Sequence, residues 1–83
     1  MRIIWDEPKR QLNLAKHGFD FVDLADGSFF ETAVITPSVQ GRFKAIGILR
    51  DGTIAVIFAR LGTQGIAVIS MRPANRKERS LLP

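Results

Sequence analysis

The side chains of this sequence that are best suited to chemistry are cations. Guanidinium groups match phosphate oxygens bidentately, and histidine, with an ordinary pKa of about 6.5, suits proton transfer at neutral pH. When RNA is cleaved by attack of its own 2′-hydroxyl, the reaction needs a base that takes the 2′ proton. It also needs cations that stabilise the phosphorane and a donor that protonates the leaving 5′ oxygen. The candidate catalytic residues are Lys16, His17, Arg42, Arg72 and Glu78, and the candidate substrate-binding residues are Arg60, Arg76 and Arg79.

Each candidate also has a structural interpretation. The base is either His17 or a lysine whose pKa is lowered by its neighbours. Lys16 and His17 would equally stabilise the last turn of a helix, and Glu78 would serve as a capping residue. Trp5 is expected in the core. Arg72 follows an apolar run, and a cation that ends a buried strand usually has a partner or a ligand.

Other chemistries lack the residues that they need. The chain contains no cysteine and one histidine, which excludes disulfides, thiolate metal sites and a convincing histidine-based site. It has no glycine-rich phosphate loop, no HExxH motif and no nucleophile elbow. We therefore expect neither a metal nor a cofactor.

A strand and two helices are predicted before the first long strand. Residues 2–5 form a short strand, and Asp6 caps a helix that ends near His17, with Gly18 as its stop. A shorter helix is capped by Asp20 and ends near Gly27. On the first helix, the spacing predicts one polar face and a core-facing side. The polar residues are Lys9, Asn13, Lys16 and His17, and the core-facing residues are Leu12 and Ala15.

The rest of the chain predicts strands and a last short helix. The strands span residues 29–36, 43–50, 53–60 and 66–72, and Asp51-Gly52 favours a type I′ turn. Asn75 and Glu78 form a capping box. The fold class is α+β: an N-terminal strand and two helices, an antiparallel meander and a short C-terminal helix, with the helices on one face of the sheet. We expect one domain over residues 1–83.

Charge is distributed unevenly along the sequence. The net charge is +4, but residues 1–31 carry four basic and six acidic side chains, whereas residues 32–83 carry eight basic and two acidic ones. This favours a polyanion or an acidic protein as partner of the C-terminal half, and a solubilising surface is the simpler alternative. Without a signal peptide or a long apolar run, we expect a soluble cytoplasmic protein that does not bind membranes.

Three ordered blocks of residues resemble one known family. Trp5-Asp6-Glu7-x-Lys9-x-x-x-Asn13-x-x-Lys16-His17-Gly18 resembles the N-terminal motif of the BrnT toxins, also called DUF497. Arg42-Phe43-x-x-Ile46-Gly47 is similar to the central arginine strand of that family. Ile69-Ser70-x-Arg72-x-Ala74-x-x-x-Glu78-Arg79 is similar to its C-terminal motif. Together the blocks span nearly the whole chain.

The resemblance implies a RelE-like fold and a type II toxin that cleaves RNA without a metal and blocks translation. It also implies a BrnA-like antitoxin with a ribbon-helix-helix domain, and contact with operator DNA only through the toxin–antitoxin complex. By matching position, the functional residues are Lys16, His17, Arg42, Arg72, Arg76 and Glu78, with Trp5 and Asn13 mainly structural. The alternative is a weak or inactive homologue that binds nucleic acid or the antitoxin, since Gly41 replaces an acidic residue common in the family.

Overall fold

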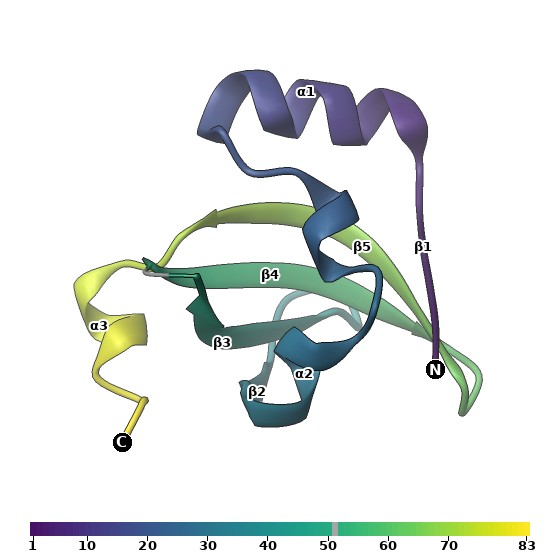
Figure 1. Ribbon diagram of the computed structural model, residues 1–83. Coiled ribbons are helices and arrows are strands. Elements are labelled where there is room, and N and C mark those ends of the chain that lie inside the picture. The colour runs from purple at the N-terminus through teal and green to yellow at the C-terminus, as the bar shows by residue number, and fades with distance from the viewer. Residues whose placement is uncertain (51) are drawn as a thin grey trace.

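The chain folds around one five-stranded sheet with the order β1-β5-β4-β3-β2, as the computed structural model shows for residues 1–50 and 52–83 (Figure 1). The strands are β1 (Arg2–Trp5), β2 (Val34–Pro37), β3 (Phe43–Leu49), β4 (Gly52–Leu61) and β5 (Gly65–Pro73). The helices are α1 (Glu7–His17), the 3₁₀ turn η1 (Phe21–Leu24), α2 (Ser28–Thr32) and α3 (Arg76–Arg79). None of these helices combines the length and apolar character needed to span a bilayer.

The strand pairing confirms the predicted meander and extends it. Strands β2, β3, β4 and β5 pair antiparallel in sequence order, whereas β1 pairs parallel with β5 at the edge of the sheet. Leu49 pairs with Gly52 across the β3–β4 hairpin. The predicted type I′ turn depends on Asp51, which lies outside the described residues.

Helix α1 begins and ends as predicted, but it faces the sheet with its polar side. Asp6 accepts a hydrogen bond from the Lys9 amide, and Gly18 ends the helix at φ 76°. Asn13 is its one buried residue, whereas Leu12 is 71% exposed, so the prediction that Leu12 and Ala15 face the core is wrong. The physical reason is that α1 lies along the edge of β5 rather than over a sheet face, as Figure 1 shows.

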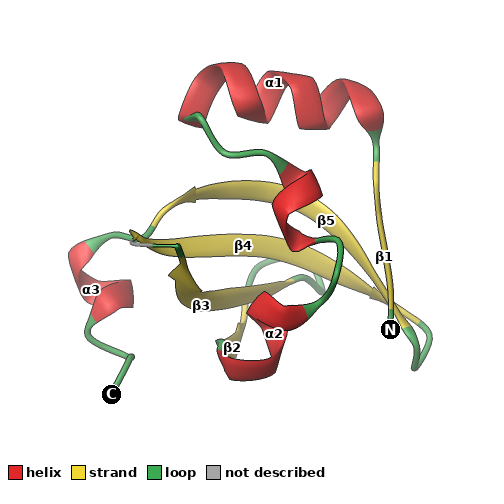
Figure 2. Cartoon of the chain, viewed as in Figure 1, coloured by secondary structure: helices red, strands yellow, loops and turns green. Residues whose placement is uncertain are grey.

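The segment after α1 differs from the prediction. Asp20 caps as expected, but the element that follows is the short turn η1 rather than a helix that continues to Gly27. The predicted strand over residues 29–36 is wrong in its first half, because Ser28–Thr32 is helix α2 and only Val34–Pro37 is strand (Figure 2). Asp26 accepts hydrogen bonds from the amide and hydroxyl of Ser28, which favours a helix start over a strand.

The two faces of the sheet are covered differently. One face carries the main core, where η1 and α2 place Phe21, Leu24 and Phe29 against β3, β4 and β5. We call the opposite side the outer face, where Ile46 and Ala55 pack with Ala74 and Leu82 at the end next to α3. The expectation that all helices lie on one face is therefore wrong, because the C-terminal segment supplies apolar contacts to the other face.

Candidate active site

A buried carboxylate organises the cations at the α3 end of the outer face. Glu78 is 4% exposed, and its two oxygens accept hydrogen bonds of 2.7 and 2.8 Å from the terminal nitrogens of Arg72. The Lys44 ammonium lies 2.8 Å from the same carboxylate. Glu78 also completes the predicted capping box. Its carboxylate accepts from the backbone N–H of Asn75, and the side-chain oxygen of Asn75 accepts from the backbone N–H of Glu78. One carboxylate thereby positions two cations and one helix start.

The electrostatics of this cluster leave an excess positive charge. The hydrogen bonds from Arg72, together with Lys44 and the Asn75 amide, hold the pKa of Glu78 far below its ordinary range, although burial acts in the opposite direction. The same hydrogen bond raises the pKa of Arg72. Glu78 is thus ionised at neutral pH, and with Lys44 and Arg72 both charged the three side chains carry a net charge of +1.

Strand register places further polar groups beside this cluster. Lys44, Ile57 and Ser70 face one another on β3, β4 and β5, and Arg72 follows Ser70 by two residues on the same face of β5. Neighbouring strands lie about 4.8 Å apart, so the Cα atoms of Lys44 and Ser70 are roughly 10 Å apart. A pocket of about 430 Å³ opens at Lys44 and Glu78, with Thr36, Asn75 and Lys77 also on its wall.

A second pocket lies between α1 and β5. It encloses about 270 Å³ and is lined by Lys9, Leu12, Asn13, Lys16 and His17 of α1 and by Ile69 and Ser70 of β5. The Asn13 amide fixes the two elements, because it donates to the Met71 carbonyl at 2.9 Å and accepts from the Met71 amide at 3.0 Å. The predicted polar face of α1 therefore lines a groove, with Asn13 as its structural member.

The structure does not bring all of the sequence candidates together. Arg72 pairs with Ala55 near one end of β4, whereas Arg60 lies five residues further along β4 and Arg42 precedes β3 at that same far end. At about 3.3 Å per residue, five residues separate the two ends by roughly 17 Å. Arg42 and Arg72, both candidate catalytic residues, therefore lie at opposite ends of the sheet and are too far apart to hold one phosphate together.

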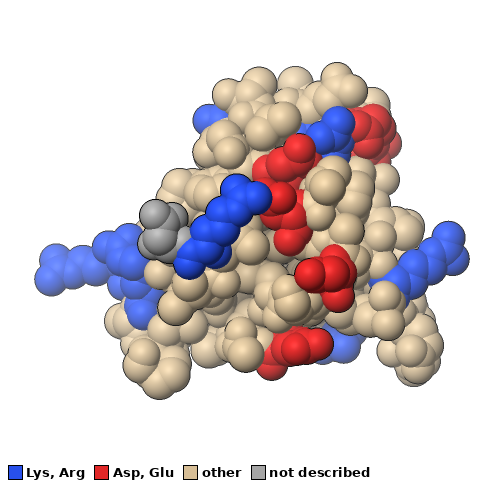
Figure 3. Space-filling model, in the orientation of Figure 1, with Lys and Arg blue, Asp and Glu red and all other residues tan. Residues whose placement is uncertain are grey.

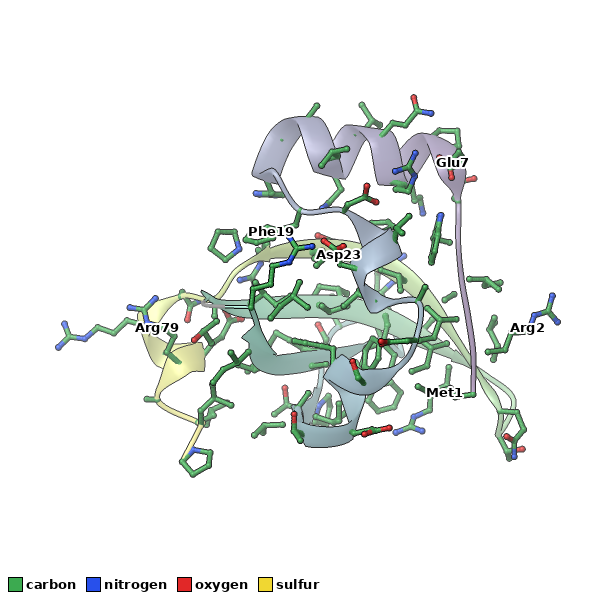
Figure 4. All side chains as sticks on the ribbon, in the orientation of Figure 1. Met1, Arg2, Glu7, Phe19, Asp23 and Arg79 are labelled. Carbon is green, nitrogen blue, oxygen red and sulfur yellow. The ribbon has the colours of Figure 1, made fainter. Side chains whose placement is uncertain are left out.

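The two arginines of α3 are close to Arg72 in the fold but differ in their contacts. Arg79 donates to the Ala74 carbonyl at 2.8 Å and projects from the molecule at the α3 end (Figure 4). Arg76 is exposed, and no ion pair involves it in the part of the chain that the structure describes. Both remain candidates for contacts with flanking phosphates.

Two residues of the site were not singled out from the sequence. Lys44 is 26% exposed on a central strand, and Ser70 joins the wall of the α1 groove. The signal for Lys44 is its place inside an otherwise apolar strand, Phe43–Leu49, where a charge requires a partner. Its partner, Glu78, lies far away in sequence, so spacing alone could not connect them.

Charge is divided between the faces of the molecule. Figure 3 shows acidic side chains gathered over the middle of the face that η1 and α2 cover. These elements and their flanks carry Asp20, Asp23, Asp26 and Glu31. Arg10 and Arg50 pair with Asp20 and Asp23 on this side. Lys9 and Lys16 of α1, which form no ion pair within the described residues, are left to attract an anionic ligand.

The donor set at the site does not suit a metal ion. Within residues 1–50 and 52–83, no three side chains of histidine, cysteine, aspartate or glutamate lie close enough to hold one. The single carboxylate of the site, Glu78, already accepts from Arg72, Lys44 and Asn75. The groups that the site offers are hydrogen-bond donors and cations, which suit a phosphate.

Two comparisons with known proteins match most of this chain. A profile of the family described as "Ribonuclease toxin, BrnT, of type II toxin-antitoxin system" matches residues 5–78. The 1.1 Å crystal structure of the Brucella abortus ribonuclease toxin, BrnT, is 51% identical, with a TM-score of 0.83 over 92% of this chain and 99% of that one. No curated protein matches the chain. The chain therefore belongs to the BrnT family of ribonuclease toxins of type II toxin–antitoxin systems.

Proposed function

We propose that this protein is a metal-independent endoribonuclease, the toxin of a type II toxin–antitoxin pair. The observation that carries the proposal is the cationic cluster of Arg72 and Lys44, held by buried Glu78 beside the α1 groove. Glu78 fixes both cations in place before substrate arrives. Preorganised charge of this kind is the largest contribution to many phosphoryl and acyl transfer reactions.

The proposed reaction uses groups from two places: the cluster of Arg72 and Lys44, and the last turn of α1. The 2′-hydroxyl oxygen attacks the adjacent phosphorus, and the bond from phosphorus to the 5′ oxygen breaks. Lys44 and Arg72 stabilise the extra negative charge of the phosphorane. Lys16 or His17, on the last turn of α1, accepts the 2′ proton and supplies one to the leaving oxygen. Arg76 and Arg79 bind flanking phosphates.

The test is cleavage of single-stranded RNA by the purified chain in the presence of EDTA. Attack by the 2′-hydroxyl leaves a 2′,3′-cyclic phosphate and a 5′-hydroxyl, and a 2′-O-methyl group at the cleavage site stops the reaction. Replacing both Lys16 and His17 with alanine lowers the rate of RNA cleavage by roughly 10²–10⁴-fold. Gln11→Ala, an exposed change on the same helix, is the matched control and leaves the rate unchanged.

Two outcomes would overturn this mechanism. Loss of cleavage in EDTA that magnesium restores would show a metal enzyme. A wild-type rate in the folded double variant would remove Lys16 and His17 from the chemistry, because it would leave Lys9 as the remaining proton-transfer group of that groove among the described residues.

A second candidate function is supported by one observation. Both terminal nitrogens of Arg72 already donate to Glu78, which suits a structural clamp between β5 and α3 as well as a phosphate site. A weak or inactive homologue that binds nucleic acid or the antitoxin would have this feature. Binding of RNA without cleavage across a pH series would favour this binding module.

The remaining expectations concern the cellular role. The family description names a toxin–antitoxin system, and we infer an antitoxin partner for this chain. That partner is a BrnA-like ribbon-helix-helix protein, through which the complex contacts operator DNA. The toxin has a RelE-like fold and acts in the cytoplasm. There its cleavage of RNA blocks translation. Co-expression of the neighbouring gene, with relief of growth arrest as the readout, tests this assignment.

A further inference from the structure

The pocket of about 430 Å³ on the outer face lies directly beside the cationic cluster. Thr36 and Lys44, which pair across β2 and β3, form its wall on the sheet. The other wall comes from α3 and its flanks, which Figure 1 shows beside β3: Asn75, Lys77, Glu78, Ser80 and Leu81. Because Lys44 and Glu78 belong to both the cluster and the pocket, a ligand bound at Lys44 reaches the pocket without crossing the sheet.

The size and the apolar surface of this pocket suit a flat ring. Its volume lies within the range of roughly 300–1,000 Å³ that small-ligand sites have. Leu81 is 50% exposed and lines the pocket, and the aliphatic stems of Lys44 and Lys77 extend this apolar surface. A nucleobase has two apolar faces and a polar edge, so it can pack against such a wall while its edge meets polar groups.

The polar groups of the pocket that are committed to one role are hydrogen-bond donors. The Asn75 side-chain oxygen accepts from the Glu78 backbone N–H at 2.8 Å, which leaves the NH₂ group of Asn75 to donate. Lys77 forms no ion pair in the described part of the chain, and an ammonium group can only donate. The carboxylate of Glu78 is already occupied by two cations and a backbone N–H. The acceptors left to a ligand are the hydroxyl oxygens of Thr36 and Ser80.

We propose that this pocket binds a base next to the scissile phosphate and selects uracil or guanine over cytosine or adenine. The keto oxygens of uracil and guanine accept hydrogen bonds where the amino groups of cytosine and adenine donate them. The proposal rests on the RNA-cleaving function proposed above and names the base preference of that site. Lys44 links base and phosphate, because an ammonium has three N–H donors and only one needs to point at Glu78.

The contact that asparagine usually makes with adenine is blocked in this pocket. Asparagine recognises adenine by using its side-chain oxygen and nitrogen together. The Asn75 oxygen already accepts from the Glu78 backbone N–H, so only the nitrogen remains. Lysine, in contrast, is a common partner of the guanine keto oxygen. Asn75 and Lys77 therefore both favour a keto base.

The experiment compares the binding of RNAs that cannot be cleaved. Fully 2′-O-methylated oligouridine and oligocytidine lack the nucleophile, carry the same charge and differ at one edge of the base. We expect the wild-type protein to bind oligouridine roughly fivefold more tightly, as for one hydrogen bond gained. In oligocytidine, a single inosine, which has the keto oxygen of guanine, should raise the affinity more than a single adenosine.

Asn75→Asp is the informative variant because it exchanges a donor for an acceptor. Aspartate caps a helix as well as asparagine does, so the start of α3 is retained. An aspartate oxygen accepts from the amino group of cytosine and repels the uracil oxygen, so the preference should reverse in favour of oligocytidine. Gln64→Glu, an exposed change in the turn between β4 and β5, adds the same charge and should leave the ratio of the two affinities unchanged. Lys77→Met keeps the aliphatic stem and should bring the ratio closer to one.

Several outcomes would overturn the proposal. These are equal binding of the two oligonucleotides by the wild-type protein, binding of neither, and an unchanged ratio in folded Asn75→Asp. If Asn75→Asp does not fold, an unchanged ratio in Lys77→Met overturns it instead. If the ratios change as expected but no RNA is cleaved, the proposed function fails and this base pocket stands. Cleavage of RNA without any base preference has the opposite meaning.

Discussion

Replacing Glu78 with glutamine keeps the shape of a buried side chain and removes its charge. In the wild-type protein this carboxylate accepts from both terminal nitrogens of Arg72 and lies 2.8 Å from the Lys44 ammonium. Glutamine retains one oxygen acceptor but turns an amide group, which can only donate, towards one of the cations. Two positive charges would then lie close together with no negative charge between them.

The expected loss of stability follows from the exposure of these three side chains. Removing one partner of a fully buried ion pair costs about 3–5 kcal/mol. Glu78 is 4% exposed, but Arg72 and Lys44 are 31% and 26% exposed, so water partly screens the two cations. We expect the unfolding free energy of Glu78→Gln to fall by about 2–3 kcal/mol, which lowers the Tm of a domain this size by roughly 10–20 °C.

The loss depends on pH with a definite sign. The pKa of Glu78 is lowered in the folded state, so its contribution is fully present above the unfolded pKa of about 4.3 and disappears as pH falls through the folded value. The stability difference between wild type and Glu78→Gln should therefore be constant from pH 7 to about pH 5 and narrow below about pH 4.

Urea unfolding of both proteins at several pH values is the assay. Glu31→Gln, an exposed glutamate without an ion pair in the described residues, is the control and should change stability by less than about 0.5 kcal/mol. If Glu78→Gln lowers the unfolding free energy by less than about 1 kcal/mol, the reasoning is refuted, because losing the charge of a carboxylate that binds two cations should destabilise the fold by more than that. So would a difference that stays constant down to pH 2.

Two further substitutions test the packing. Asn13→Ala removes the hydrogen-bond partners of the Met71 backbone N–H and carbonyl, and should lower the unfolding free energy by about 2–4 kcal/mol in urea titrations. A change below about 1 kcal/mol would mean that the position of α1 does not depend on this contact. Gly47→Ala places a Cβ 2.9 Å from Cε1 of Phe29, so thermal unfolding should show a loss of about 1–3 kcal/mol, and an unchanged Tm would contradict the close approach of α2 to β3.

Local signals in the sequence were sufficient for most of the elements. The caps at Asp6, Asp20 and Asn75 have the predicted hydrogen bonds, because each depends on residues only two or three positions away. Strands β3, β4 and β5 match their predicted spans to within one residue at every end. The strand prediction was wrong for residues 29–32. The high strand propensity of phenylalanine was outweighed by the helix-start signal at Asp26 and by the burial of the Phe29 ring in the core.

The site was harder to predict, since its contacts are long in sequence. Arg72 and Glu78 were identified separately from the sequence, Glu78 both as a candidate catalytic residue and as a cap, and the structure adds the ion pair between the two. Lys44 could not be linked to Glu78 without the strand register. Leu12 was assigned to the core because helical periodicity finds an apolar side but not whether a sheet lies behind it.

The single buried residue of α1 has a consequence for how this helix moves. Because Asn13 is the one fully buried residue of α1, and the half-buried Arg10 and His17 are polar, detaching the helix exposes little apolar surface. What holds it is polar: the hydrogen bonds of Asn13 with Met71 and the ion pair that Arg10 forms with Asp20. Local opening of α1 therefore needs less free energy than global unfolding, and its amide hydrogens exchange with solvent before those of β4 and β5. The candidate proton-transfer residues Lys16 and His17 therefore lie on an element that opens at a lower free energy than the central strands.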